Sequence, residues 1–486
     1  MSLIRAEGVS FSYFGSLKPV FTNLNFTADS SWRTGLIGAN GSGKTTLFKI
    51  LCGEEKCGGK IISNLRFVRF PFAADRYESV SDIAARCGEE WRLARELSLL
   101  GLSGDIRYRP LYTLSGGERT KVMLAALFCS DGFPLIDEPT DSLDMRGRER
   151  LAEYLRGKRG YIVASHDRAF LDKCTDHTLS LADGCAEIVA GSYSVWKEEN
   201  DRRIASAGEK KRSLENEAER MTAAAQRTAR WAARAEQAKF GIQKSGLKAD
   251  KGFVSASAAR VMKRARISAE RKNSAAENAR QLAAMLPQEE KITFTPQICR
   301  KQCIFEVADA RIEAGGTVIL RGVSLRVMRG ERLAVAGENG CGKSTLLKFI
   351  AENVQGAEVS YVSQQCEDVG GTPAQYASEW GIDEPSFKSM LSKLGFGRTD
   401  WDKDMSLLST GQRKKAALAR SLLTKAQLYI WDEPFNYLDI SAREMIEEAI
   451  TASCPSMVFV EHDAAFVSRA ATRVLQLGQD ARKLPS

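Results

Sequence analysis

Two nearly identical glycine-rich loops constrain this chain more than any other feature. The first runs Gly38-Ala-Asn-Gly-Ser-Gly-Lys44-Thr45, and the second runs Gly337-Glu-Asn-Gly-Cys-Gly-Lys343-Ser344. Each loop follows a short apolar stretch and precedes a helix-like run, which is the setting that the GxxxxGK[ST] pattern requires. There the glycines let backbone N–H groups curl around phosphates, the lysine reaches the β and γ oxygens, and the next hydroxyl holds Mg²⁺. The sequence therefore predicts two nucleotide sites.

The same order of elements recurs around both loops. An apolar strand ends in Glu138 in the first half and in Glu433 in the second, and a later strand ends in His166 and in His462. The two loop lysines lie 299 residues apart, the two glutamates 295 and the two histidines 296. Such a nearly constant offset indicates that one module has been duplicated.

Acidic and histidine side chains supply the predicted chemistry. In each module the first of two adjacent acids can bind Mg²⁺, and the second can orient or deprotonate a water for in-line attack on the γ-phosphate. A lone histidine is more often structural than catalytic, but two of the three histidines occupy equivalent places, which favours a catalytic role. The predicted catalytic residues are Glu138, Glu433, His166 and His462, and the predicted metal ligands are Thr45, Asp137, Ser344 and Asp432.

The segment between the two copies, from about Lys197 to Pro287, is rich in helix-forming residues and has no proline before its end. Glycines near residues 245–252 predict that the helix turns back there as a hairpin. Residues 197–286 hold 21 Lys or Arg against 11 Asp or Glu, and the whole chain has a net charge of +9. This excess of one sign favours binding to a polyanion. A solvated helix face is the alternative.

Composition limits the class of protein. No stretch reaches eighteen consecutive apolar residues, so no membrane span is expected. The opening residues read as strand and leave no room for a secretory signal. The eleven cysteines lie scattered without a CxxC pair, which favours free thiols in a reducing cytosol. A cytoplasmic location is therefore expected.

Two further runs identify the type of module. Leu114-Ser115-Gly116-Gly117-Glu118 and Leu408-Ser409-Thr410-Gly411-Gln412 resemble the signature of ABC ATPases. The resemblance implies an α/β fold in which two P-loop modules stack head to tail within one chain. Lys44 is then expected to face Ser409, and Lys343 to face Ser115. ATP and Mg²⁺ are the implied cofactors.

The resemblance also implies accessory residues. Tyr13 is expected to stack on adenine at the first site, whereas Ile312, which has no ring, stands at the equivalent place in the second module. Gln364 is expected to contribute to the second site, and the first module has no glutamine at the equivalent place. Unequal hydrolysis at two competent sites is plausible on these grounds. Cys341 replaces a small hydroxyl residue and serves either as a neutral side chain or as a reactive thiol. The predicted ATP-binding residues are Tyr13, Gly38, Asn40, Gly41, Ser42, Gly43, Lys44, Thr45, Thr46, Ser115, Gly116, Gly117, Gly337, Asn339, Gly340, Cys341, Gly342, Lys343, Ser344, Thr345, Gln364, Ser409, Thr410 and Gly411.

Two such modules joined by a charged helical linker resemble the ABC-F family. The implied organisation is a first ABC domain over 1–195, a basic helical hairpin over 196–290 and a second ABC domain over 291–486. Family members bind the ribosome, and their linker reaches toward the P-site tRNA and the peptidyl transferase centre. The run from Trp431 to Asp439 and the basic residues after Gln412 resemble the branch that protects ribosomes from antibiotics. The resemblance implies 23S rRNA and P-site tRNA as partners, without a stable membrane partner. The predicted RNA-contacting residues are Lys239, Lys244, Lys248, Lys251, Phe253, Arg260, Lys263, Arg264 and Arg266.

Three alternatives to ribosome protection stay open. The nearest is a housekeeping or stress translation factor of the same family. A transporter ATPase would borrow a membrane partner, for which a basic hairpin has no evident use. A DNA-associated ATPase is disfavoured, because the long coils or zinc modules typical of such proteins are not visible. The sequence also leaves one difference without a physical account, since Asp141 stands where the second copy has Asn436.

Overall fold

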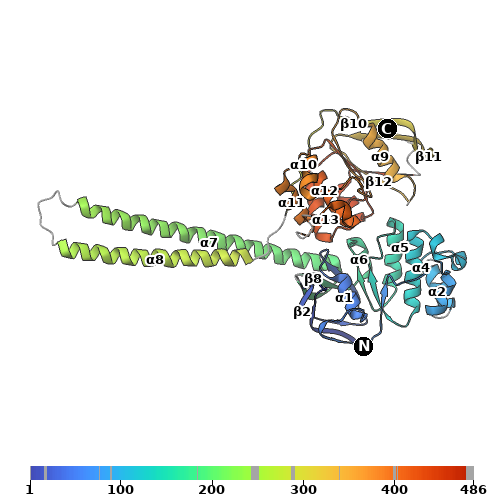
Figure 1. Ribbon diagram of the computed structural model, residues 1–486, viewed down its shortest axis with the longest axis horizontal. Helices are drawn as coiled ribbons and strands as arrows, with labels where there is room; N and C mark the ends of the chain where they lie inside the picture. Colours follow the sequence, from blue (N-terminus) through green and yellow to red (C-terminus); the bar gives the residue numbers. More distant parts are fainter. Residues whose placement is uncertain are drawn as a thin grey trace. The chain divides into compact units, whose positions relative to one another are not determined.

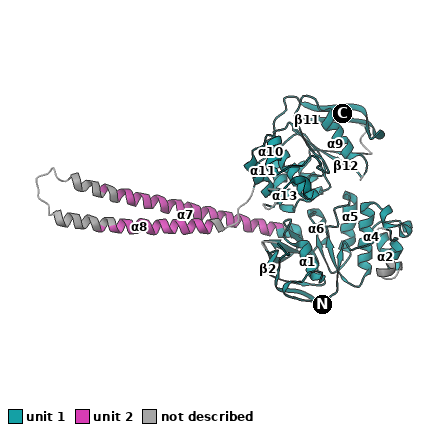
Figure 2. Cartoon of the chain, in the orientation of Figure 1, with its two compact units in different colours: residues 1–196, 291–486 teal, residues 197–290 magenta. Residues whose placement is uncertain are grey.

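The computed structural model describes residues 2–15, 19–75, 77–87, 90–182, 184–241, 251–285, 291–338, 340–397, 401 and 403–477. The chain forms two compact units, residues 1–196 with 291–486 and residues 197–290 (Figure 2). The first unit holds two α/β modules, called here the first module (1–196) and the second module (291–486), and the second unit is a helical hairpin. The predicted fold class is thereby confirmed.

A six-stranded sheet in the order β5-β6-β7-β3-β8-β9 forms the centre of the first module. All neighbouring strands are parallel except β8 and β9. The strands are β3 (Arg33–Gly38), β5 (Phe67–Phe70), β6 (Phe133–Asp137), β7 (Tyr161–Ala164), β8 (His177–Ala182) and β9 (Cys185–Ala190). Strand β7 is buried along its whole length, as expected for a parallel sheet covered on both faces.

The two faces of this sheet support separate apolar clusters. Ile136 and Val163 belong to the cluster under α4 and α5, and Leu135 and Ile162 belong to the cluster with α1 and an antiparallel sheet in the order β2-β1-β4. The elements are β1 (Leu3–Phe11), β2 (Phe21–Asp29), β4 (Gly58–Ile62), α1 (Lys44–Leu51), α2 (Val80–Cys87), α3 (Glu90–Leu99), η1 (Gly104–Tyr108), η2 (Leu111–Thr113), α4 (Gly116–Cys129), α5 (Met145–Arg156) and α6 (Arg168–Cys174).

The second module repeats this plan. Its parallel sheet has the order β13-β14-β15-β12-β16, and β10 pairs with β11 in a separate ribbon. The elements are β10 (Cys303–Ala314), β11 (Thr317–Met328), β12 (Arg332–Ala336), α9 (Lys343–Asn353), β13 (Val359–Val362), α10 (Pro373–Glu379), α11 (Glu384–Lys393), η5 (Met405–Leu407), α12 (Thr410–Leu423), β14 (Leu428–Asp432), α13 (Ile440–Ser453), β15 (Met457–Val460), α14 (Ala464–Ala470) and β16 (Arg473–Gln476). The loop-bearing strands β3 and β12 lie at equivalent places in the two sheets.

The hairpin consists of two long antiparallel helices, α7 (Tyr193–Gly241) and α8 (Lys251–Met285) (Figure 1). Their seam is lined by small side chains, with Ala218, Ala276 and Ala279 forming a buried cluster. The expected turn at residues 245–252 lies mostly outside the described residues, and α8 already begins at Lys251. None of the described helices combines enough length and apolar character to span a lipid bilayer.

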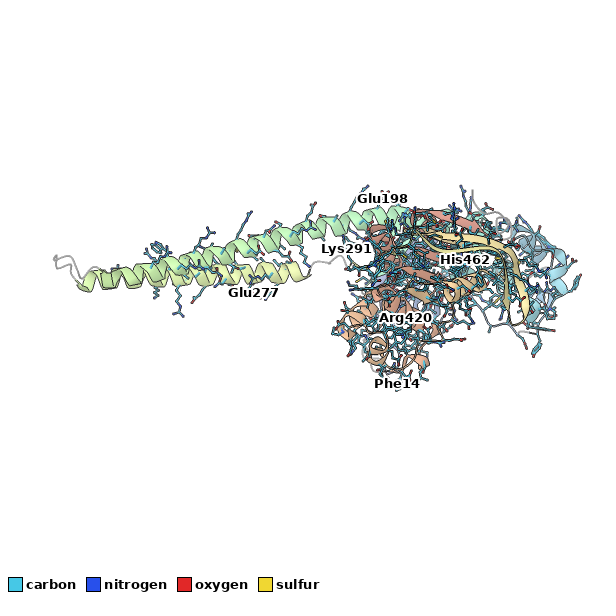
Figure 3. All side chains as sticks on the ribbon, turned by 90° about the horizontal axis from the view of Figure 1, so that it is seen from above. Phe14, Glu198, Glu277, Lys291, Arg420 and His462 are labelled. Carbon is cyan, nitrogen blue, oxygen red and sulfur yellow. The ribbon has the colours of Figure 1, made fainter. Side chains whose placement is uncertain are left out.

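Hydrogen bonds between the two limbs fix their register. Lys272 Nζ donates to Thr228 Oγ1 at 3.3 Å, and Arg280 Nη2 donates to Thr222 Oγ1 at 3.2 Å. The threonine hydroxyls in turn donate to backbone carbonyl groups one turn earlier. Much of the remaining polar surface projects outward, as the side chains around Glu277 illustrate (Figure 3). The hairpin is therefore internally locked while its charged face stays exposed.

A buried ion cluster joins the two modules within the first unit. Arg168, at the start of α6, donates through Nη2 to Glu447 Oε2 at 2.7 Å and to Asp463 Oδ2 at 3.3 Å. The three side chains are 5%, 5% and 1% exposed. Ala464 stands at the equivalent of Arg168 in the second module, so the cluster has no counterpart there. Ile440, at the start of α13, packs into an apolar cluster of the first module.

We expect Arg168→Ala to destabilise the first unit by about 3–5 kcal/mol, because the buried carboxylate of Asp463 would lose the cation beside it and Glu447 would keep only Arg469. Urea unfolding followed by circular dichroism measures the change. The control is Lys173→Ala, which removes an ion pair to Glu149 whose side chains are both more than half exposed. That change should cost no more than about 1 kcal/mol. Equal effects of the two substitutions would contradict the importance of the buried cluster.

Candidate nucleotide sites

Each glycine-rich loop leads into a helix through a backbone conformation that favours glycine. Gly43 precedes α1 with φ 97°, and Gly342 precedes α9 with φ 96°. A Cβ on Gly43 would also lie 2.6 Å from Phe21 Cζ. This backbone turns the first N–H groups of the helix toward the loop, which creates an anion-binding helix N-terminus.

The side chain of each loop lysine points back into the glycine-rich loop that precedes it. Lys44 Nζ donates to the Gly38 carbonyl at 2.8 Å, and Lys343 Nζ donates to the Gly337 carbonyl at 2.8 Å. Both side chains are buried. Burial lowers the pKa of Lys44, and the carboxylates of Glu138 and Asp439 oppose this effect. A cation held among loop carbonyls next to helix N–H groups suits polyphosphate.

The predicted magnesium ligands pair a hydroxyl with a carboxylate. Thr45 Oγ1 donates to Asp137 Oδ2 at 2.7 Å. In the second module Asp432 is buried, and its Oδ1 has no hydrogen-bond partner within the described structure. Burial raises the pKa of Asp432, while a hydrogen bond from Ser344 opposes the rise. These oxygens fit Mg²⁺, which keeps waters and substrate phosphates as its other ligands and, when bound, neutralises phosphate charge. Among the described residues, no group of three or more acidic, histidine or cysteine side chains is placed so that it could hold a metal ion by itself.

The two predicted catalytic glutamates have the same backbone geometry. Glu138 and Glu433 both adopt the left-handed region, with φ 44° and 48°. His166 Nε2 lies 3.3 Å from Glu138 Oε1, and His462 Nε2 lies 3.4 Å from Glu433 Oε1. Left-handed backbone is costly for a non-glycine residue, and its repetition indicates that the geometry serves a function.

The environments of these glutamates differ. Burial, with Asp141 as the next cause, raises the pKa of Glu138 to about 8. Burial acts on Glu433 in the same direction, but contacts with His462 and Gln364 outweigh it and lower its pKa to about 2. The two side chains are 22% and 14% exposed, so exposure alone does not account for opposite shifts. The neighbouring side chains therefore account for the opposite pKa shifts of the two glutamates.

Each signature run forms a capping box at the start of a helix. Ser115 caps α4 and exchanges hydrogen bonds with Glu118, and Ser409 caps α12 and exchanges them with Gln412. The glycines and Thr410 that follow begin these helices. Both helix N-termini are therefore ordered and rich in N–H groups, as a phosphate contact requires.

The first glycine-rich loop meets the second module. Asn40 N donates to Asp439 Oδ2 at 3.0 Å, and its side chain donates to the Tyr437 carbonyl at 2.6 Å. Arg443 Nη1 of the second module donates to the His166 carbonyl at 2.9 Å. Residues of both modules thus border the first site. Asp439, Asn436 and Arg443 were not among the predicted site residues, although the run after Glu433 had been singled out.

The remaining predicted ATP-binding residues surround these loops. Tyr13, whose ring is partly exposed, makes a 2.9 Å hydrogen bond with Thr46 Oγ1. At the second site, Ile312 lines a cavity of about 500 Å³ together with Ser344, Thr345, Gln364 and Asp432. Asn339 lies outside the described residues.

The predicted RNA-contacting side chains are partly described. Arg260, Lys263, Arg264 and Arg266 are exposed on α8. Lys239, Lys251 and Phe253 lie within the helices, whereas Lys244 and Lys248 lie outside the described residues. Sequence reasoning missed Trp231, which is 60% exposed among the exposed arginines Arg227, Arg230 and Arg234.

Comparison with known proteins agrees with this geometry. The family model described as ABC transporter matches residues 21–141 and 320–436, one segment in each module. With two glycine-rich loops, two signature runs and paired glutamates and histidines, the chain is an ABC ATPase and hydrolyses ATP. Its tandem modules and its relatives define it further as a member of the ABC-F family.

Similar proteins cover nearly all of the chain. "Probable ATP-binding protein YbiT" of Escherichia coli O157:H7 is 28% identical and covers 96% of this chain and 94% of its own. "Ribosome protection protein VmlR" of Bacillus subtilis (strain 168) is 26% identical, and the match covers 94% of this chain and 84% of the relative. An archaeal ribosome recycling factor, solved in complex with a ribosomal stalk protein, is similar in fold, with a TM-score of 0.63 and 19% identity. The match covers 96% of this chain and 87% of the recycling factor.

The two sites are expected to differ in pH dependence. A glutamate that accepts a proton must be ionised, so a raised pKa means that activity is lost as the pH falls below that value. The Glu433→Gln variant retains only the first site. Its rate of hydrolysis should rise between pH 6.5 and 8.5, with a midpoint near the pKa of Glu138. Hydrolysis by Glu138→Gln should lack this rise, since Glu433 is ionised throughout. Phosphate release at saturating MgATP measures both profiles, and parallel profiles would contradict the assignment.

Proposed function

We propose that this chain is an ATP-dependent ribosome-binding protein that inserts its hairpin toward the P-site tRNA and the peptidyl transferase centre and dislodges antibiotics there. The observation that carries the proposal is the exposed basic face of the hairpin. Arg260, Lys263, Arg264 and Arg266 are exposed on α8, and Glu270 is the single acidic residue in the sequence from 251 to 272. Of these, Arg266 pairs with Glu270 across an exposed turn of helix. Such a surface suits contact with the phosphates of folded RNA.

An exposed aromatic ring adds a second kind of RNA contact. Trp231 lies on α7 between Arg230 and Arg234, with Arg227 one turn earlier. Large aromatic rings are usually buried, and an exposed one beside guanidinium groups can stack on an unpaired base. This combination fits RNA better than a purely solvated face, for which acidic and basic residues would alternate.

The nucleotide sites supply the switch in this proposal. ATP and Mg²⁺ bind between each glycine-rich loop and the opposite signature, and binding closes the modules. Glu138 and Glu433 orient the attacking water, and His166 and His462 contact them. Hydrolysis removes the γ-phosphate that bridges the modules, so the closed form opens and leaves the ribosome. The name of VmlR supports the resistance branch by similarity only.

A second candidate is a translation factor of the same family without a resistance role. Its support is that YbiT, which covers a similar share of the chain, is named only as a probable ATP-binding protein. Drug susceptibility of a sensitive strain expressing this chain separates the two candidates. Protection against lincosamides, streptogramin A compounds or pleuromutilins favours the first, and unchanged susceptibility favours the second.

We expect Glu138→Gln with Glu433→Gln to trap the protein on ribosomes, because ATP would bind but would not be hydrolysed. Sedimentation in the presence of ATP should place the double variant with 70S particles, whereas the wild-type protein should mostly dissociate. The control adds Lys44→Ala and Lys343→Ala, which remove the phosphate-binding cations and should abolish trapping. A double variant that sediments free of ribosomes would contradict the proposal.

Neutralising the hairpin tests the RNA contact separately. Changing Arg260, Lys263, Arg264 and Arg266 to Gln should weaken binding of the trapped form to ribosomes at least tenfold. It should also reduce the slope of log K against log salt by roughly 3, because each lost phosphate contact removes about 0.7–0.9.

The matched control removes the same charge elsewhere. Arg5, Lys173, Arg300 and Arg311 are exposed basic residues of the two modules, and their change to Gln should leave the slope nearly unchanged. ATP hydrolysis in the absence of ribosomes should be equal in the two quadruple variants. Equal losses of ribosome binding would show that overall charge, and not the hairpin, accounts for the affinity.

A further inference from the structure

The carboxylates of Glu138 and Glu433 are held by different hydrogen-bond donors. Glu433 Oε2 accepts a hydrogen bond from Asn436 Nδ2 at 2.7 Å and another from Gln364 Nε2 at 3.0 Å. Glu138 Oε2 accepts one from the backbone N–H of His166 at 3.1 Å, and Glu138 Oε1 lies 3.3 Å from His166 Nε2 without forming a hydrogen bond in the described structure. Two side-chain amides therefore fix the second glutamate, and one backbone group holds the first.

The difference originates in two sequence positions. Asp141 follows Glu138 by three residues, just as Asn436 follows Glu433. The amide of Asn436 donates a hydrogen bond, whereas an ionised aspartate only accepts and repels the ionised form of Glu138 that the reaction requires. Strand β5 is followed by Pro71, Phe72 and Ala73, where the second module supplies Gln364 after β13. The first site thus lacks both amide donors.

We propose that Asn436 is a positioning residue that holds Glu433 in its productive orientation, and that Asp141 at the equivalent place makes the first site the slower of the two. The proposal rests on the water-orienting role of the two glutamates, which is part of the proposed function. Phosphoryl transfer depends on positioning more than on covalent chemistry by the protein, so a fixed carboxylate promotes turnover. The second site then performs most of the hydrolysis, while the first site retains its ATP for longer.

This division agrees with the contacts around the first site. Asn40 is hydrogen-bonded to Asp439 and Tyr437 of the second module, and Arg443 holds the His166 carbonyl. The buried cluster of Arg168 with Glu447 and Asp463 starts two residues beyond that histidine. A site bordered by so many contacts between the modules is suited to retain nucleotide while the modules stay together.

Reciprocal substitutions test the proposal. With the second site inactivated by Glu433→Gln, Asp141→Asn should raise kcat of the first site about tenfold and change KM less than about twofold, since one hydrogen bond to a carboxylate corresponds to that factor. With the first site inactivated by Glu138→Gln, Asn436→Asp should lower kcat of the second site by a similar factor. A gain of activity cannot result from damage to the fold, and thermal unfolding of each nucleotide-free variant checks the loss.

A third substitution separates positioning from removal of charge. Asp141→Ala abolishes the carboxylate without supplying an amide, so at a pH above the raised pKa of Glu138, where that group is ionised with or without Asp141, it should not reproduce the gain seen with asparagine. Equal gains from alanine and asparagine would overturn the positioning role, and so would unchanged kcat in both reciprocal variants.

Retained nucleotide provides a readout other than the rate. After rapid gel filtration of protein loaded with radiolabelled MgATP, the wild-type chain should keep ATP at one site and ADP or no nucleotide at the other. Asp141→Asn should reduce the retained ATP, and an unchanged amount would contradict the inference. Persisting hydrolysis in Glu138→Gln with Glu433→Gln would instead refute the water-orienting role within the proposed function, so the two failures are distinguishable.

Discussion

A guanidinium group buried between two modules is the interaction on which the rest of the first unit depends. Arg168 is buried between two carboxylates of the other module, and its own charge is compensated only while the modules stay in register. Arg443 crosses in the opposite direction and holds the carbonyl of His166, which lies beside Glu138. The predicted catalytic histidine and the contact between modules thus share one short segment, so the geometry of the first site depends on the pairing of the modules.

Duplication has preserved the backbone of the two sites and changed their charges. Both glutamates adopt the same unusual φ, and both face a histidine at nearly the same distance. The residue three positions later differs between a carboxylate and an amide, and this difference alone reverses an interaction from repulsion to hydrogen bonding. The two modules therefore keep the same strands and helices around the glutamate while its neighbour differs.

The sequence predicted most of the fold, because its strongest signals are local. The loop that ends in Lys44, the signature at Ser115 and the alanine-rich linker each specify a conformation within a few residues. Contacts that join distant segments were harder to foresee. The sequence showed that Asp141 stands where the second module has Asn436. The consequence of this difference depends on which hydrogen-bond donors reach Glu433, and these donors lie 69 and 3 residues away from it in the chain. Arg168 resembled any basic residue at a helix start, and only the assembled modules bury it. Trp231 was missed because an aromatic residue within a helix usually indicates packing.

The seam of alanines in the hairpin has a mechanical consequence. Small side chains let α7 and α8 approach closely, and the bonds of Lys272 and Arg280 to threonines prevent one limb from sliding along the other. The pair therefore bends less than a single helix and behaves as a stiff lever. A helix of 49 residues extends about 70 Å, so a rotation of about 5° at its base moves the far end by about 6 Å. Small angular adjustments near Tyr193 are thereby amplified into displacements as large as a nucleotide base.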